Sequence, residues 1–139
     1  MSRFTPAEIA YLQSQRLGRL ATVDAKGDLH VVPVGFRYNS EQDAIDIGGH
    51  NIAPTKKYRD AVRHGRVAFV IDDVLPPWQP RMIEIRGTVQ GLSEGGKQIM
   101  ESFSPDILRL TPTYIVSLGV NDDEVHPGQG RVNYSARKV

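Results

Sequence analysis

The chain has 139 residues, of which 40% are hydrophobic and 24% charged, and we expect one domain that spans residues 1–139. The absence of cysteine excludes disulfides, thiolate nucleophiles and cysteine-based zinc or iron–sulfur sites. A formal net charge of +1 gives no general attraction to nucleic acid or to a membrane surface, so we expect neither as a partner.

The first predicted element is a short helix that begins after Thr5. Thr5, Pro6 and Glu8 occupy the N-cap, first and third positions of a capping box, in which the side chains of residues 5 and 8 satisfy each other's backbone N–H groups. The helix is expected to end near Gln15, where a period of two begins.

Period-two hydrophobicity predicts strands over residues 17–23, 29–38, 44–48, 66–71, 82–90 and 114–120. Two more helices are predicted over 53–64, ended by Gly65, and over 93–103, and a proline-rich loop over 72–80. From Asn121 the chain is polar and glycine-rich, and we expect residues 121–139 to form a loose tail. Strands joined by hairpins predict a mainly β (α+β) barrel with short peripheral helices rather than a doubly wound sheet.

Familiar catalytic patterns are absent. The histidines, at positions 30, 50, 64 and 126, do not form an i, i+4 pair, so no metal site is expected, and no GxSxG turn marks a serine nucleophile. No catalytic residue is therefore assigned. The chain also has no apolar run near the ~20 residues of a membrane span and no signal-peptide core, so we expect a cytoplasmic protein.

One segment has unusual charge for its position. Thr55, Lys56 and Lys57 stand at the start of the second predicted helix, where positive N–H groups and the helix dipole favour acidic side chains. An anion such as phosphate would bind the free N–H groups, the Thr55 hydroxyl and the lysines together. The alternative is a solvated basic face continued by Arg63 and Arg66.

Two other segments suggest contact with a ligand. The strand that begins at His30 is apolar but interrupted by Pro33 and Gly35, and offers a flat surface to a planar heterocycle. Its alternative is an edge strand with a bulge. Trp78, the one tryptophan, stands in a proline-rich segment and has three candidate roles: packing on the core, stacking on a ligand or filling a subunit interface.

Five stretches, in this order, resemble the pyridoxamine 5′-phosphate oxidase-like split-barrel superfamily and its F420 (deazaflavin)-dependent oxidoreductase branch. They are SQRLGRLATV (14–23), HVVPVGF (30–36), TKKYR (55–59), RVAFVIDD (66–73) and IEIRG (83–87). The resemblance covers about residues 4–120 and implies a six-stranded split barrel of the FMN-binding type. It also implies a homodimer with cofactor sites at the subunit interface.

In this family the cofactor ring lies against the second strand, the basic segment holds the phosphate, and the other subunit closes the site. The candidate cofactor-binding residues are therefore His30, Val31, Val32, Pro33, Val34, Thr55, Lys56, Lys57 and Trp78. The resemblance implies hydride transfer between F420 and a conjugated small organic substrate. FMN in the same barrel, a non-catalytic flavin- or deazaflavin-binding protein, and a haem protein with His30 or His50 as ligand are the alternatives.

The chain departs from the family pattern near its end. Tyr114 and Leu118 stand where relatives often carry a basic residue and a tryptophan, and the C-terminal Arg- and His-bearing segment of true pyridoxamine phosphate oxidases is missing. Oxidation of vitamin B6 is therefore not expected. The substrate, the direction of the reaction and the proton donor are left unassigned.

Overall fold

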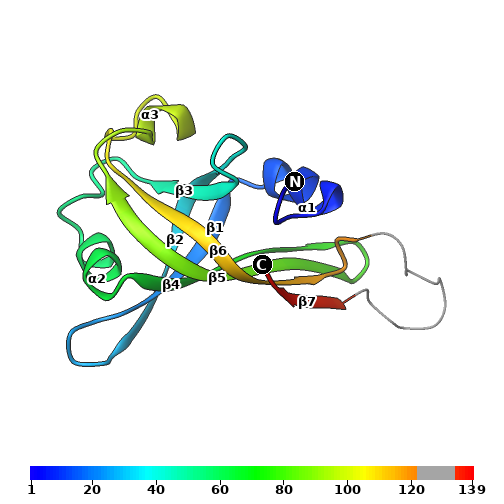
Figure 1. The fold of residues 1–139 in the computed structure, drawn as a ribbon. Coiled ribbons are helices and arrows are strands. Elements are labelled where there is room, and N and C mark those ends of the chain that lie inside the picture. Colours follow the sequence, from blue (N-terminus) through cyan, green and yellow to red (C-terminus); the bar gives the residue numbers. More distant parts are fainter. Residues whose placement is uncertain (122–133) are drawn as a thin grey trace.

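The computed structural model describes residues 1–121 and 134–139 (Figure 1). Its helices are α1 (Pro6–Ser14), α2 (Lys56–His64) and α3 (Gly96–Ile99). Its strands are β1 (Leu17–Val23), β2 (Leu29–Asn39), β3 (Ala44–Gly48), β4 (Arg66–Leu75), β5 (Gln79–Leu92), β6 (Ile107–Leu118) and β7 (Tyr134–Lys138). Residues 122–133 of the expected tail, His126 among them, lie outside the described part.

Six of the strands close into a barrel. The order is β3-β2-β1-β4-β5-β6, every neighbouring pair is antiparallel, and β3 also pairs with β6 to complete the ring. Strand β7 pairs with the outer edge of β6 (Figure 1). The predicted six-stranded split barrel is thus confirmed, while the prediction of a loose tail is wrong for residues 134–138.

The barrel interior is filled by the alternate, inward-facing residues of each strand. Leu20, Phe69 and Ile85 are direct neighbours in the registers of β1, β4 and β5, and all three are fully buried or nearly so. Burial of such side chains stabilises the fold by roughly 1.5–3 kcal/mol each. Since successive strand residues face opposite sides, the residues between them form the outer surface.

The helices lie outside the barrel. The capping box of α1 is confirmed: the Thr5 hydroxyl accepts from the Glu8 N–H at 3.1 Å, and the Glu8 carboxylate accepts from the Thr5 N–H at 2.9 Å. Helix α2 begins at Lys56, with Thr55 as N-cap, and ends at Gly65 with a left-handed φ of 82°. It packs beside β1 and β5 at the end of the barrel where the β1–β2 turn lies (Figure 1).

The predicted loop over 72–80 is instead the end of a long hairpin. Pairing of β4 with β5 continues through Asp73↔Arg81 and Val74↔Pro80 to Leu75↔Gln79. The Arg81 guanidinium donates to Asp73 at 2.9 Å, and the Tyr11 hydroxyl donates to the same carboxylate at 3.0 Å. These bonds join the hairpin to α1 and offset the weak strand propensity of the proline-rich tip.

The predicted helix over 93–103 is reduced to the single turn of α3. Gly95 has a φ of 127°, and Gly96 packs so closely on the Ser104 carbonyl that a Cβ would overlap it. Strand β6 then starts at Ile107, seven residues before the predicted start at 114, because β3 needs a partner to close the barrel. Leu110 of β6 lies opposite Ile45 of β3.

None of the helices in the described residues is long and apolar enough to cross a membrane.

Candidate cofactor site

A shallow groove of about 350 Å³ lies on the outer face of β1, β2, β4 and β5. The residues that line this apolar groove are Arg19, Ala21, Val31, Ala68, Phe69, Val70, Met82 and Glu84. Ala21 lies opposite both Val31 on β2 and Ala68 on β4. Two adjacent alanines leave a hollow between the longer side chains around them, and the floor is consequently flat and apolar.

The surface around the groove exposes large apolar side chains. Leu29 is 84% exposed and Val31 71%, while Trp78, at the tip of the β4–β5 hairpin, is 77% exposed. Such clustering is typical of surfaces that contact a ligand or another protein.

The strand β2 divides the predicted ring-binding residues between its two faces. Val31 and Pro33 lie on the outer face, whereas Val34 is buried in the core and Val32 packs against it. The side chains of Val32 and Val34 thus point away from the groove, and only the backbone of these residues is offered to it. That a ring lies against residues 31–34 stays a prediction, in which Val31 and Pro33 would offer side chains and Val32 and Val34 only their backbone.

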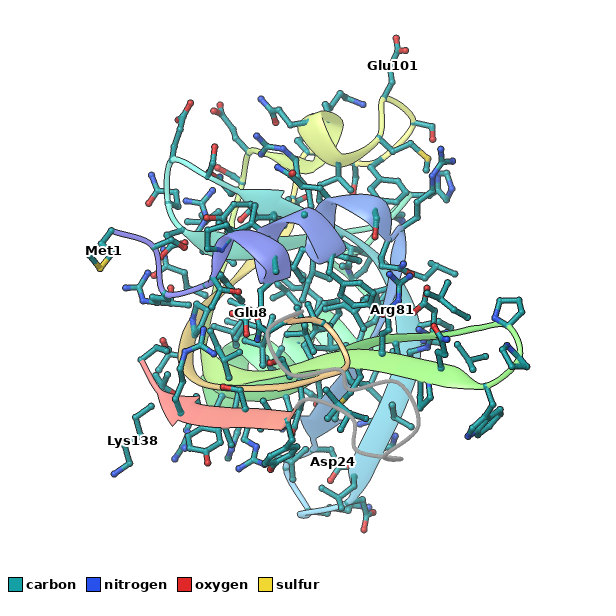
Figure 2. The ribbon with its side chains drawn as sticks, turned by 90° about the vertical axis from the view of Figure 1, so that its right-hand side faces the viewer. Met1, Glu8, Asp24, Arg81, Glu101 and Lys138 are labelled. Atoms are coloured by element: carbon teal, nitrogen blue, oxygen red, sulfur yellow. The ribbon has the colours of Figure 1, made fainter. Side chains whose placement is uncertain are left out.

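The start of α2 is partly neutralised by carboxylates of the chain itself. The Lys56 ammonium lies 2.9 Å from Asp60 and 3.5 Å from Asp24, and its hydrogen bond to Asp60 raises the pKa of Lys56. A hydrogen bond from His30, at 3.1 Å, lowers the pKa of Asp24. Asp24, at the tip of the β1–β2 hairpin (Figure 2), consequently stays ionised and connects His30 with Lys56.

Fewer groups at the start of α2 are therefore free to bind an anion than the sequence predicts. The Thr55 hydroxyl is occupied as a cap, since it accepts from the Tyr58 N–H at 3.4 Å and donates to the Ile52 carbonyl at 2.6 Å. Lys57 has no ion-pair partner within residues 1–121 and 134–139 and is half-buried. The first helical N–H groups, of residues 56 and 57, have no intrahelical acceptor.

The groove and the helix start lie at the same end of the barrel. Asp24 follows the end of β1, three residues after Ala21 and roughly 10 Å from it at the rise of a strand, and its carboxylate contacts Lys56. Trp78, by contrast, lies beyond Leu75 at the far tip of the β4–β5 hairpin. The fold thus brings His30 and Val31 close to residues 55–57, and it places Trp78 away from them within one chain.

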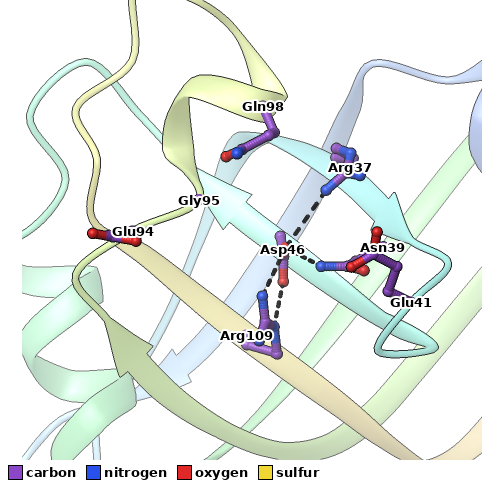
Figure 3. A pocket seen from close by; sticks show the side chains of 8 residues that line it. All are labelled: Arg37, Asn39, Glu41, Asp46, Glu94, Gly95, Gln98 and Arg109. Carbon is purple, nitrogen blue, oxygen red and sulfur yellow. Dashed lines mark hydrogen bonds and ion pairs between the residues drawn. The ribbon is translucent and has the colours of Figure 1, made fainter.

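A second, polar pocket of about 280 Å³ lies beside α3 (Figure 3). Its lining residues are Arg37, Asn39, Glu41, Asp46, Glu94, Gly95, Gln98 and Arg109. At its floor the buried Asp46 accepts from Arg109 at 2.8 and 3.2 Å and from Asn39 at 2.9 Å, and Arg37 lies 3.9 Å away. Because Arg37 and Arg109 are the register partners of Asp46, this cluster joins β2, β3 and β6.

Sequence reasoning missed most of the groove. Arg19, Ala21, Ala68, Val70, Met82 and Glu84 were not candidates. Their outward positions follow from the alternation within each strand, but the pairing that places them side by side does not.

The chain thus combines a six-stranded split barrel with an apolar groove and a basic helix start at one end. The family model of pyridoxamine 5′-phosphate oxidase matches residues 4–116, so the chain belongs to this family. It is 40% identical over 122 residues to a 5a,11a-dehydrotetracycline/5a,11a-dehydrooxytetracycline reductase of Streptomyces rimosus, covering 86% of each chain. The expectation of an oxidoreductase is thereby confirmed at the level of the class.

Two solved structures show the same fold. A FAD binding protein from Mycobacterium smegmatis superposes with a TM-score of 0.63 and 22% identity, covering 84% of this chain and 96% of that one. A pyridoxamine 5′-phosphate oxidase-related, FMN binding protein from Nostoc punctiforme has a TM-score of 0.62 and 11% identity, with coverages of 99% and 98%.

Proposed function

We propose that the protein is an F420-dependent oxidoreductase that transfers a hydride between the deazaflavin and a conjugated small organic substrate. The observation that carries the proposal is the flat apolar groove at the same end of the barrel as the start of α2, where Lys57 has no ion-pair partner among the described residues. The 40% identity to a reductase of a polycyclic substrate supports the same class of reaction.

The residues present suit such a cofactor. The alanines at 21 and 68 and the side chain of Val70 form a floor on which a planar ring can stack. The Lys57 ammonium and the N–H groups of residues 56 and 57 suit the phosphate, and Asp60 holds Lys56 in place. The cofactor, when bound, supplies the hydride chemistry, while the protein orients the reactants and excludes water.

FMN is the second candidate, because ring edge and phosphate are common to both cofactors and a structural neighbour binds FMN. F420 also carries an oligoglutamate tail, which favours an extended basic track. Arg59 is exposed beside the helix start and suits such a tail, whereas Arg63 already donates to Asp60 and to the Val23 carbonyl, both at 3.1 Å.

The cofactor is tested by titrating the purified protein with F420 and, separately, with FMN while following Trp78 fluorescence. We expect F420 to bind, and Lys57→Ala to weaken its binding about 10- to 100-fold, the value of a charge-assisted hydrogen bond. The double variant Lys56→Ala/Lys57→Ala should bind at least as weakly. Lys138→Ala, an exposed lysine on β7, is the control. Tight binding of FMN alone would transfer the protein to the flavin branch, and binding of neither would refute the proposal.

We further propose that two copies form a homodimer through the outer face that carries the groove. The exposed Leu29, Val31 and Trp78 would be covered in this way, and Trp78 of the second copy would close the site. Sedimentation velocity should give a mass near twice the 15.4 kDa of the chain. Val31→Asp/Leu29→Asp is expected to shift the protein to monomers and to weaken binding of the cofactor, and a monomeric wild-type protein would contradict the arrangement.

A further inference from the structure

Arg19 is the one cationic side chain among the described residues that line the apolar groove. It projects from the outer face of β1, between its register partners Pro33 on β2 and Val70 on β4. Glu84 is the next residue in the same row, opposite Val70 on β5. The groove therefore has a cation on one side of Val70 and a carboxylate on the other, roughly 10 Å apart at the spacing of neighbouring strands.

The two charged residues differ in how firmly they are paired. Glu84 is held by a two-point contact with Arg86, at 2.9 and 3.1 Å. Arg19 makes a single contact at 3.0 Å with Asp72, and the two side chains are 40% and 54% exposed. An exposed ion pair of this kind contributes about 0–1 kcal/mol, so the Arg19 guanidinium can exchange Asp72 for an oxygen of a molecule in the groove at small cost.

We infer that Arg19 binds the carbonyl oxygen of a substrate whose reducible double bond is conjugated with that carbonyl. This inference rests on the proposed function and names its substrate class, a planar enone. Reduction adds a hydride from the reduced deazaflavin to the β-carbon, and the π pair of the double bond moves to place a negative charge on the carbonyl oxygen. A proton from solvent then adds to the α-carbon, and the cofactor is left oxidised.

Negative charge develops on the carbonyl oxygen during the reaction, and Arg19 is placed to stabilise that charge. A guanidinium within an apolar groove stabilises an enolate oxygen more strongly than the neutral carbonyl, and thus accelerates the chemical step. Glu84, on the opposite side of Val70 and already bound to Arg86, has no hydrogen bond to donate to that oxygen, so the contact with Arg19 sets the orientation of the substrate. A planar molecule without a conjugated carbonyl gains nothing from this arrangement.

The test uses 5a,11a-dehydrotetracycline, an enone and the substrate in the name of the 40% identical relative, with reduced F420. Arg19→Met is expected to lower kcat about 100-fold, as loss of one donor to an oxyanion does, and Arg19→Lys to recover part of it. The dissociation constant of F420 should change less than twofold. Arg16→Met, an exposed arginine that lines neither the groove nor the polar pocket, is the matched control and should behave as wild type.

Other results would overturn the inference in distinguishable ways. Unchanged turnover by Arg19→Met, or F420 affinity that falls in step with turnover, would show that Arg19 does not act on the substrate. If wild-type protein binds F420 but neither reduces the probe nor binds it beside oxidised F420, the enone class is wrong while the proposed cofactor stands. If wild-type protein binds no F420, the proposed function fails, and this inference falls with it.

Discussion

Replacing Asp46 by alanine is expected to lower the free energy of unfolding by about 3 kcal/mol, the lower end for a broken buried pair, because it leaves the buried Asn39 amide and the partly exposed Arg109 guanidinium without their carboxylate. Asp46 is 1% exposed and accepts from Arg109 and Asn39, and Arg37 lies beside it (Figure 3). Asp46 lies on β3 and contacts residues of both neighbouring strands, β2 and β6, and the pairing of β3 with β6 closes the barrel. Urea unfolding monitored by circular dichroism gives the measurement.

A double-mutant cycle separates this cluster from a general loss of packing. Asp46→Ala, Arg109→Met and the double variant should show a coupling energy of about 1–3 kcal/mol, as expected for residues of one ion-pair network. The exposed pair Glu84–Arg86 is the matched comparison, and its coupling should stay below about 1 kcal/mol. Equal coupling energies at the two pairs would contradict a special role for Asp46.

Glu8→Ala is expected to destabilise the protein by about 3 kcal/mol and to release β7 from the barrel, because Arg137 loses its buried partner. Glu8, on α1 in Figure 2, is fully buried, and the guanidinium of Arg137 donates to it at 2.6 and 3.0 Å. Asn121 donates to the same carboxylate at 3.2 Å. Hydrogen exchange should show that Glu8→Ala accelerates exchange in residues 134–138 more than in the barrel core.

The same contact predicts a dependence on pH. Burial raises the pKa of Glu8, but hydrogen bonds from Arg137, from the Thr5 N–H and from Asn121 outweigh it, and the pKa is lowered. A carboxyl whose pKa is lower in the folded state stabilises the fold above its unfolded pKa, and this contribution is lost as the pH falls through the folded pKa.

Glu8→Gln is consequently expected to flatten the loss of stability in acid, measured by urea unfolding between pH 7 and pH 3. Glu101→Gln, an exposed carboxyl at the top of the view in Figure 2 and away from Glu8, should keep the wild-type dependence. An acid dependence unchanged by Glu8→Gln would place its origin in other carboxyls, such as Asp43 and Asp73, whose pKa values are also lowered.

Local pattern was sufficient where neighbours along the chain decide the structure. The capping box at Thr5, the end of α2 at Gly65 and the first strands were predicted from sequence with bounds at or near those observed. Hydrogen bonds that close within four residues, and the alternation of apolar side chains, act before any distant contact forms. The ion pair of Lys56 with Asp60 could also have been predicted from their i, i+4 spacing. It shows that part of the positive charge at the start of α2 is neutralised within the helix.

Sequence by itself therefore determined the mainly β architecture, the family resemblance and the basic segment at residues 55–57. Only the tertiary structure decided the early start of β6, the return of the chain as β7, and the groove in which Ala21 meets Ala68. Each of these depends on which strands pair and in which register. Register is set by contacts between residues far apart in the chain, such as Glu8 with Arg137, and such contacts leave no periodic signal in the segments that make them.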